Sequence, residues 1–369
     1  MDPLPHESPA GDRAIKLPVL QATAPAATAS PGAPKAARYR SPAARMPALR
    51  WVVQFAFLGL TAVIAYEFAV FYAQARAGGP VTAARPSGVE AFLPLSALLA
   101  LRRFLATGSW DFVHPAGLTF LAAAILGAVL ARRAFCAWVC PFGLAGRILE
   151  VIREKVFRLP PRWKFPTWTR WPFLVPKYLL LGFFLWTIGS MPLAGIESFL
   201  RAPYNLAADA NMWLFLVHLS GVALAVIATL VVLSALFRNA WCRFLCPYGA
   251  LLGLGALLSP FRIARDPDAC VNCGACARAC PSGIPVDRRR SVVTAECTAC
   301  LSCVAACNVK GALDVRAVGG KRVRAWVLPA IALGVLLFAY GATVGTRYWD
   351  TSLTEREFIE AYRIGAKER

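Results

Sequence analysis

The sequence predicts an all-α polytopic membrane bundle that carries a small, cysteine-rich α+β domain toward its C-terminal end. Hydrophobic residues make up 58% of the 369 positions and charged residues only 16%, whereas about a quarter of an ordinary soluble chain is charged. Long apolar runs recur along the chain, and its twelve cysteines fall into tight groups. Grouped cysteines indicate a metal or redox site rather than a disulfide framework.

Apolar runs predict about five transmembrane helices, since roughly 20 apolar residues cross a bilayer as a helix. The expected spans cover about residues 51–73, 116–133, 172–191, 212–237 and 326–345. The first four make up a membrane domain over residues 49–261. Between the first two spans, the stretch EAFLPLSALLALRRFL contains Pro94 and two arginines. This stretch favours a short re-entrant or interfacial helix.

The two ends of the chain differ from the apolar middle. Residues 1–48 are rich in Ala and Pro and have no hydrophobic periodicity, which predicts a disordered cytoplasmic tail without a cleaved signal sequence. Residues 346–369 form a C-terminal tail that we expect to be helical. Its Ser352 and Glu355 have the spacing of a capping box.

The distribution of basic residues predicts the orientation. Segment 132–172 holds nine Lys and Arg against two acids, and segment 238–325 holds thirteen against five. Basic loops stay on the cytoplasmic side, so the cysteine-rich domain is expected to face the cytoplasm from a bacterial cytoplasmic (inner) membrane. This reading also accounts for the net charge of +20 without a nucleic-acid partner.

Residues 262–318 contain two copies of a C-x2-C-x2-C-x3-C motif. This is the spacing of bacterial two-cluster ferredoxins, in which the fourth cysteine of each motif binds the cluster of the other. The sequence thus predicts a small α+β ferredoxin-like domain with two [4Fe–4S] clusters. The expected ligands are Cys270, Cys273, Cys276 and Cys307 for cluster 1, and Cys297, Cys300, Cys303 and Cys280 for cluster 2. A pair of zinc sites is the alternative, but zinc motifs use two separated cysteine pairs.

Two further cysteine pairs follow the second and fourth apolar runs, in FCAWVCPFG and WCRFLCPYG. Residues four apart share a helix face, and the proline after each pair disfavours helical geometry at the preceding cysteine. The repeat predicts one four-sulfur site made of Cys136, Cys140, Cys242 and Cys246. Three interpretations stay open: a third redox site (metal cluster or dithiol), cysteines packed as small hydrophobes, and a transient copper site.

Ionisable residues at membrane depth suggest a quinol site, because such residues are usually functional. Glu67 lies in the first span, His114 just before the second, and His218 in the fourth. All three are expected toward the outer face. The alternative for His218 is a hydrogen bond to a neighbouring helix, and the alternative for His114 is an interfacial position.

The paired C-x3-C-P motifs, their alternation with apolar spans and the doubled ferredoxin motif resemble the NapH/NosR-type membrane-bound polyferredoxins over about residues 50–355. The resemblance implies a quinol-dehydrogenase component that feeds electrons to a periplasmic reductase. It also implies kinship with proteins that reduce copper during oxidase assembly.

These observations together predict a membrane-anchored iron–sulfur electron-transfer protein, a component rather than a complete enzyme. It would pass electrons between quinol, or a soluble donor, and a partner reductase or maturation protein. Membrane lipid, redox partner proteins and bound quinone are the expected partners and ligands. The alternatives are a copper-handling, copper-reducing assembly factor that uses the C-x3-C pairs, and a redox sensor that forms a reversible disulfide there.

Overall fold

The computed structural model describes residues 39, 41–77, 80–158 and 170–367, which belong to one compact unit. Most of the predicted disordered tail, residues 1–48, lies outside them. Its last residues are helical: a 3₁₀ turn, η1 (Pro42–Arg45), leads into helix α1 (Met46–Ala77). The helix starts earlier than expected because the Ser41 hydroxyl accepts a hydrogen bond from the Ala43 amide (3.2 Å) and Pro42 suits the first helical turn.

Three stretches of described helix are long and apolar enough to cross a membrane. They are Pro42–Ala77, Pro172–Ser190 within α6 (Arg170–Ser190), and α14 (Val327–Gly345). A fourth candidate is the pair α9 (Ala208–Val217) and α10 (Gly221–Leu236), which is bent by 79°.

The predicted continuous helix over 212–237 is therefore wrong. Helix α9 ends before His218, and α10 begins after Ser220, whose hydroxyl accepts the Ala223 amide at 3.2 Å. A serine is a favoured N-cap, so this short polar break starts a new helix in another direction. Apolar composition alone does not reveal such a break.

The predicted span at 116–133 corresponds to α3 (Pro115–Ala131), which has 17 residues. At 1.5 Å per residue it is about 25 Å long, shorter than the roughly 30 Å hydrocarbon core. It packs against α14, α2 and α11, and most of its residues are buried. The described residues thus contain three to four candidate spans, so the expected count of about five is not confirmed.

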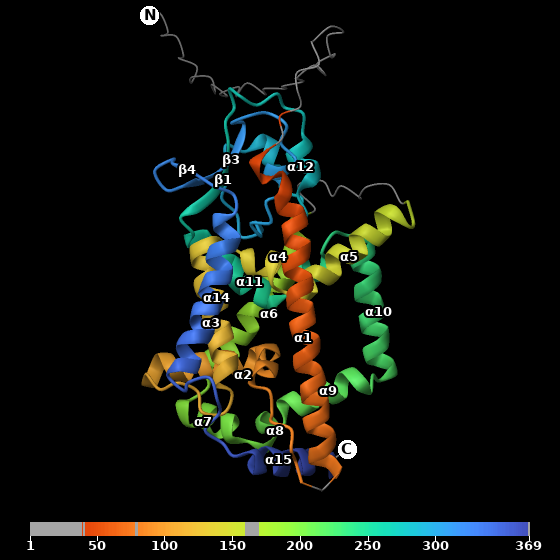
Figure 1. The fold of residues 1–369 in the computed structure, drawn as a ribbon, viewed down its shortest axis with the longest axis vertical. Helices are drawn as coiled ribbons and strands as arrows, with labels where there is room; N and C mark the ends of the chain where they lie inside the picture. Colours follow the sequence, from red (N-terminus) through yellow and green to blue (C-terminus); the bar gives the residue numbers. More distant parts are fainter. Residues whose placement is uncertain (1–38, 40, 78–79, 159–169, 368–369) are drawn as a thin grey trace, which may run out of the picture. The chain divides into compact units, whose positions relative to one another are not determined.

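Shorter helices surround these spans (Figure 1). They include η2 (Ser87–Phe92), α2 (Pro94–Thr107), α4 (Ala134–Trp138), α5 (Pro141–Lys155), α7 (Leu193–Arg201), α8 (Pro203–Leu206), the π-helical turn η4 (Trp241–Leu245), α11 (Pro247–Gly255) and η5 (Ala256–Leu258). Helix α2 is the short helix expected between the first two spans.

The C-terminal helix is α15 (Glu355–Lys367). At its start Thr354 donates to the Glu357 carboxylate from its amide (2.7 Å) and its hydroxyl (2.9 Å), so the helix is capped by this pair and not by the predicted Ser352 with Glu355. Ser352 instead donates to the carbonyl of Phe112 (3.1 Å). That tertiary contact moves the start of the helix by two residues.

The cysteine-rich segment forms a four-stranded antiparallel sheet in the order β2-β1-β3-β4. Its elements are β1 (Phe261–Arg265), α12 (Ala275–Ala279), η6 (Val286–Arg288), β2 (Ser291–Val292), α13 (Ser302–Ala305), β3 (Leu313–Ala317) and β4 (Arg322–Val323). Ile263 pairs with Val292 on one side and Val315 on the other. These buried side chains share a core with Trp138 of α4, so the sheet is joined to the ends of the helices.

Candidate metal centres

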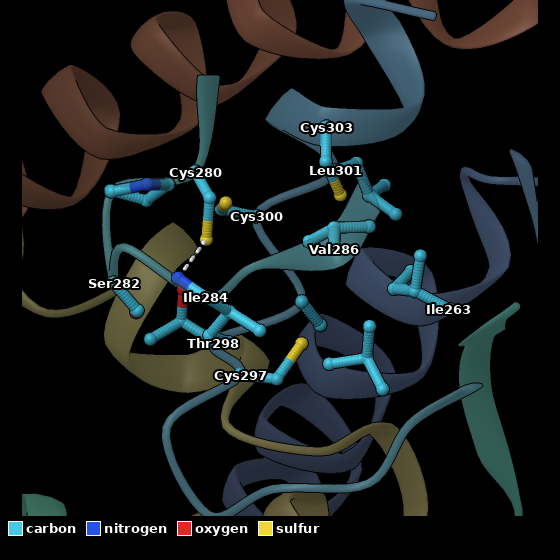
Figure 2. A pocket seen from close by; sticks show the side chains of 13 residues that line it. Ile263, Cys280, Ser282, Ile284, Val286, Cys297, Thr298, Cys300, Leu301 and Cys303 are labelled. Atoms are coloured by element: carbon cyan, nitrogen blue, oxygen red, sulfur yellow. Dashed lines mark hydrogen bonds between the residues drawn. The ribbon is translucent and has the colours of Figure 1, made fainter. Parts of the chain in front are cut away.

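Four cysteines line a buried pocket, which we call the inner pocket (Figure 2). Three come from the second motif and one from the first: Cys297, Cys300, Cys303 and Cys280. The rest of its wall is mainly aliphatic, with Ile263, Ile284, Val286, Val292 and Leu301. All four cysteines are buried. The Cys280 sulfur accepts a hydrogen bond from the Ile284 amide at 3.4 Å.

The other four motif cysteines line a second pocket, which we call the outer pocket. They are Cys270, Cys273, Cys276 and Cys307, around a space of about 370 Å³. This pocket also has the charged side chains of Arg265 and Asp287 in its wall. Cys273 is exposed, so the outer pocket reaches the protein surface, whereas the inner pocket is covered.

The two motifs wrap around their pockets with the same backbone device. In each C-x2-C-x loop, the residue before and the residue after the second cysteine have left-handed backbone angles: Asn272 and Gly274 in the first motif, Ala299 and Leu301 in the second. This conformation is easy for Gly and tolerated by Asn, but it is strained for Ala and Leu. The second loop is held in place by burial, since Ala299 and Leu301 are each only 1% exposed.

The thiols of the two pockets differ in acidity. A hydrogen bond with Arg265 lowers the pKa of Cys270 in the outer pocket. Burial, together with the negative charge of Cys300, raises the pKa of Cys280 in the inner pocket to about 12. Burial would also raise the pKa of Cys300, but the guanidinium of Arg50 and local hydrogen bonds outweigh it and lower that pKa.

The chemistry of the inner pocket fits a metal cluster. A buried thiol with a raised pKa is protonated at neutral pH unless a cation replaces its proton. Thiolates are the ligands of iron–sulfur clusters, so four cysteines that line one apolar pocket suit a group larger than a single ion that brings its own positive charge. Among the described residues, no three His, Cys, Asp or Glu side chains converge as they would around a single metal ion.

The helix-end cysteines Cys136, Cys140, Cys242 and Cys246 lie near enough to one another to interact electrostatically. Cys242 interacts electrostatically with the other three. Cys140 and Cys246 precede the first residues of α5 and α11, and both have extended backbones, as expected before a proline. Burial and the charge of Cys136 raise the pKa of Cys140 to about 12.

Two glycines allow the close packing around these cysteines. A Cβ on Gly143 would lie 2.2 Å from the carbonyl oxygen of Cys136, and one on Gly249 would lie 2.8 Å from the guanidinium of Arg133. The Gly249 amide donates a hydrogen bond to the Cys246 sulfur at 3.2 Å. The glycine of the C-P-aromatic-Gly sequence thus leaves room for neighbouring atoms at both copies of the repeat.

Direct contacts connect the helix-end cysteines to the inner pocket. The indole Nε1 of Trp138, between Cys136 and Cys140, donates to the carbonyl of Ala299 at 3.2 Å. Arg133 donates to the carbonyl of Ala295 at 3.1 Å.

A buried ion pair joins the same two regions. Nζ of Lys177 in α6 lies 2.5 Å from an oxygen of Glu296, the residue before Cys297. Arg133 lies 3.7 Å from the other oxygen of this carboxylate. Sequence reasoning missed Lys177, although a lysine within an apolar span is a signal of a buried partner.

The three residues suggested as a quinol site are not brought together. Glu67 and His218 are exposed, and His114 is buried at the start of α3. Within the described part of the chain, no hydrogen bond or ion pair joins any two of them. The quinol site made of all three residues therefore stays a prediction that these contacts do not support.

His114 instead belongs to a buried charge network that the sequence did not reveal. Arg85 lies 2.8 Å from both Glu90 and Asp209, and the Tyr362 hydroxyl donates to Asp209 at 2.8 Å. The His114 ring lies 3.4 Å from Glu90. Burial opposes ionisation of Glu90, but the charges of Arg85 and His114 hold its pKa below the usual range. The members come from four distant segments, which explains why no local motif announces them.

Comparison with known families agrees with this division into sites. A 4Fe-4S binding domain matches residues 113–160 and again 218–265, so each match contains one C-x3-C-P motif. A 4Fe-4S dicluster domain matches residues 262–308.

Curated relatives cover most of the chain. The putative electron transport protein YccM of Escherichia coli is 37% identical over 286 residues, which are 76% of this chain and 78% of YccM. Regulatory protein NosR of Pseudomonas aeruginosa is 32% identical over 50% of the chain and 25% of its own length. Ferredoxin-type protein NapH of Haemophilus influenzae is 29% identical over 53% and 68%. The chain belongs to the NapH/NosR-type family of ferredoxin-like membrane proteins.

Membership of the NapH/NosR-type family and the matched domains make this an iron–sulfur protein of electron transfer. The three to four apolar helices agree with a membrane location. No solved structure matches the chain.

Proposed function

We propose that the protein is a membrane-anchored electron carrier with two [4Fe–4S] clusters in its ferredoxin domain. Cys270, Cys273, Cys276 and Cys307 would hold one cluster, and Cys297, Cys300, Cys303 and Cys280 the other. One observation carries this proposal: each pocket is lined by three cysteines of one motif and the fourth cysteine of the other. That exchange is the ligand pattern of two-cluster ferredoxins.

Bound clusters would each supply single-electron chemistry at potentials set by charge, hydrogen bonds and exposure. The chain's own residues determine these conditions. Aliphatic side chains exclude water from the inner pocket, and Arg50 supplies positive charge near Cys300. At the outer pocket, Arg265 stabilises the Cys270 thiolate while Cys273 stays accessible.

The helix-end cysteines are proposed as a third redox or metal site. Their convergence supports this, as does the match of each C-x3-C-P segment to a 4Fe-4S binding domain. Arg133 lies beside Cys136 and Cys242 and offers a buried positive charge to thiolates. Trp138 and Arg133 would hold this site against the inner pocket.

We further propose that the ferredoxin domain faces the cytoplasm, on the strength of its basic flanking segments. Electrons would pass between quinol or a soluble donor and a partner reductase or maturation protein. The relatives named for electron transport and as ferredoxin-type proteins support a role as one component of such a system.

The iron content of protein purified without oxygen tests the proposal. Two clusters give about eight irons per chain, and a third cluster gives about twelve. Full-length protein in detergent would be assayed for iron and acid-labile sulfide, with electron paramagnetic resonance after reduction. Colourless protein that holds zinc or no metal would refute the electron-carrier proposal. Copper bound at the helix-end thiols, and lost in C136A and C242A, would instead favour copper handling.

A further inference from the structure

The exposed surface of the ferredoxin domain is strongly basic. Between Arg262 and Arg324, a stretch that the structure describes completely, nine Lys and Arg residues are exposed against a single exposed acid, Asp268. The domain's other acids are at least partly buried. This excess of solvent-facing positive charge attracts an anionic partner and speeds its approach.

Part of this charge surrounds the opening of the outer pocket. Cys273 is exposed there, and the neighbouring Val271 is 65% exposed. Arg278 and Lys310 are both exposed and follow the two motif segments that form the pocket. A small apolar spot with a polar rim is the usual layout of a protein-binding surface.

The membrane helices contact the domain elsewhere. Arg132, Arg133, Trp138 and Lys177 all reach the loop of residues 294–299, which leads into the inner pocket. Further contacts come from η1 and α1, which pack against α13, and from Arg238, which donates to the carbonyls of Arg278 and Cys280. The contact with Arg238 leaves the Arg278 side chain exposed. The outer pocket therefore opens on a side of the domain that the helix ends do not cover.

We propose that the surface formed by Val271, Cys273, Arg278 and Lys310 is the docking site of a soluble, acidic redox protein. This inference rests on the proposed function, because it makes the outer pocket the place where electrons are exchanged with a soluble partner. It goes further in naming the surface and the charge of that partner.

Anionic lipid is the competing ligand for a basic surface. A lipid-binding surface would continue the side of the domain that meets the helix ends, because those ends lie next to the membrane. The outer pocket is formed instead by the 270–276 loop and Cys307, and no residue of the 294–299 loop lines it. An accessible sulfur at the centre of the surface also suits close approach of another redox group, which lipid does not need.

Binding of an acidic plant-type ferredoxin tests the docking site. Full-length protein in neutral-lipid nanodiscs would be titrated with this probe at about 0.05 M and 0.5 M salt, since salt screens exposed charges. The variant R278E/K310E reverses two charges at the outer pocket. The control R262E/K321E makes the same change on β1 and at the β3–β4 turn, where neither residue lines a pocket. Iron is counted in every sample, and flotation with phosphatidylglycerol vesicles measures lipid binding.

We expect the dissociation constant to rise about tenfold or more with salt, and again in R278E/K310E, but less than about threefold in the control. Equal loss in both variants would overturn the docking site, because it would show unspecific attraction. The docking site would also be overturned if the unmodified protein did not bind ferredoxin and R278E/K310E lost binding to the vesicles, because the surface would then bind lipid. Ferredoxin binding with this pattern by protein that lacks iron would support the docking site while refuting the proposed clusters.

Discussion

The two cysteine pockets have the same number of ligating groups but opposite surroundings. The outer pocket has an exposed cysteine and two charged side chains in its wall, whereas the inner pocket is closed by aliphatic residues. The outer loop uses Asn272 and Gly274 at its left-handed positions, while the inner loop uses Ala299 and Leu301. The inner loop therefore depends on packing against the membrane helices to keep its backbone conformation. The outer loop can adopt the same conformation with little support from outside.

Loss of Cys280 is expected to have the largest effect of the changes considered, and to affect only one of the two pockets. This cysteine belongs to the first motif but lines the inner pocket. We expect C280S to lose the inner cluster, about four of eight irons, and to keep the paramagnetic signal of the outer one. Iron analysis and spectroscopy of the reduced variant measure both. Loss of the outer signal with retention of the inner one would mean that each motif binds its own cluster.

Thiol reactivity of the iron-free protein should separate the pockets by a large factor. The pKa of Cys270 is lowered by Arg265, and that of Cys280 is raised to about 12 by burial. Alkylation requires the thiolate. At pH 8 a thiol with a pKa of about 12 is only about 10⁻⁴ ionised. The Cys270 rate should therefore level off at a lower pH than that of an ordinary thiol, while the Cys280 rate keeps rising up to pH 10.

Mass spectrometry after timed alkylation between pH 6 and 10 gives these rates site by site. Cys276, whose pKa is raised by burial, is the matched control within the outer pocket. Equal pH profiles for Cys270 and Cys280 would contradict the assigned environments.

Removal of the buried lysine should destabilise the joint between the inner pocket and the helices. K177M leaves Glu296 with Arg133 at 3.7 Å and the hydroxyl of Tyr178 at 3.3 Å. Loss of one partner of a buried ion pair costs about 3 kcal/mol. Thermal unfolding in detergent would show the loss, and the double variant K177M/E296Q should recover much of it because no uncompensated carboxylate remains. A double variant as unstable as K177M would mean that Lys177 acts through packing alone.

The smallest expected effect is on the reduction potential of the inner cluster. Arg50 is buried and favours negative charge at Cys300, so R50Q should lower this potential by about 60 mV, a tenfold change in a one-electron equilibrium. Redox titration followed by paramagnetic resonance measures it. The outer cluster is the internal control. An equal shift of both reduction potentials would mean that Arg50 does not act on the inner cluster in particular.

Much of the site could be predicted from the sequence because its ligands are set by local spacing. The C-x2-C-x2-C-x3-C repeats predicted which cysteines share each pocket, while the four-sulfur site from the two C-x3-C-P copies stays a prediction. The clusters themselves and their number stay predictions until iron is counted.

Features that depend on tertiary contacts could not be predicted in this way. The break at Ser220 needs one capping hydrogen bond within an apolar run. The network of Arg85 and Asp209 joins residues 124 positions apart. His114 was singled out as an ionisable residue at membrane depth, but its partners come from other segments, so no local pattern could predict its ion-pair network.

The indole of Trp138 has a consequence for dissecting the molecule. Its hydrogen bond to the Ala299 carbonyl helps to hold the inner loop in a left-handed backbone conformation, which Ala299 and Leu301 disfavour. A fragment of residues 262–324 would lack Trp138 and therefore this hydrogen bond. Such a fragment should assemble a cluster in the outer pocket more readily than in the inner pocket, and so hold one cluster.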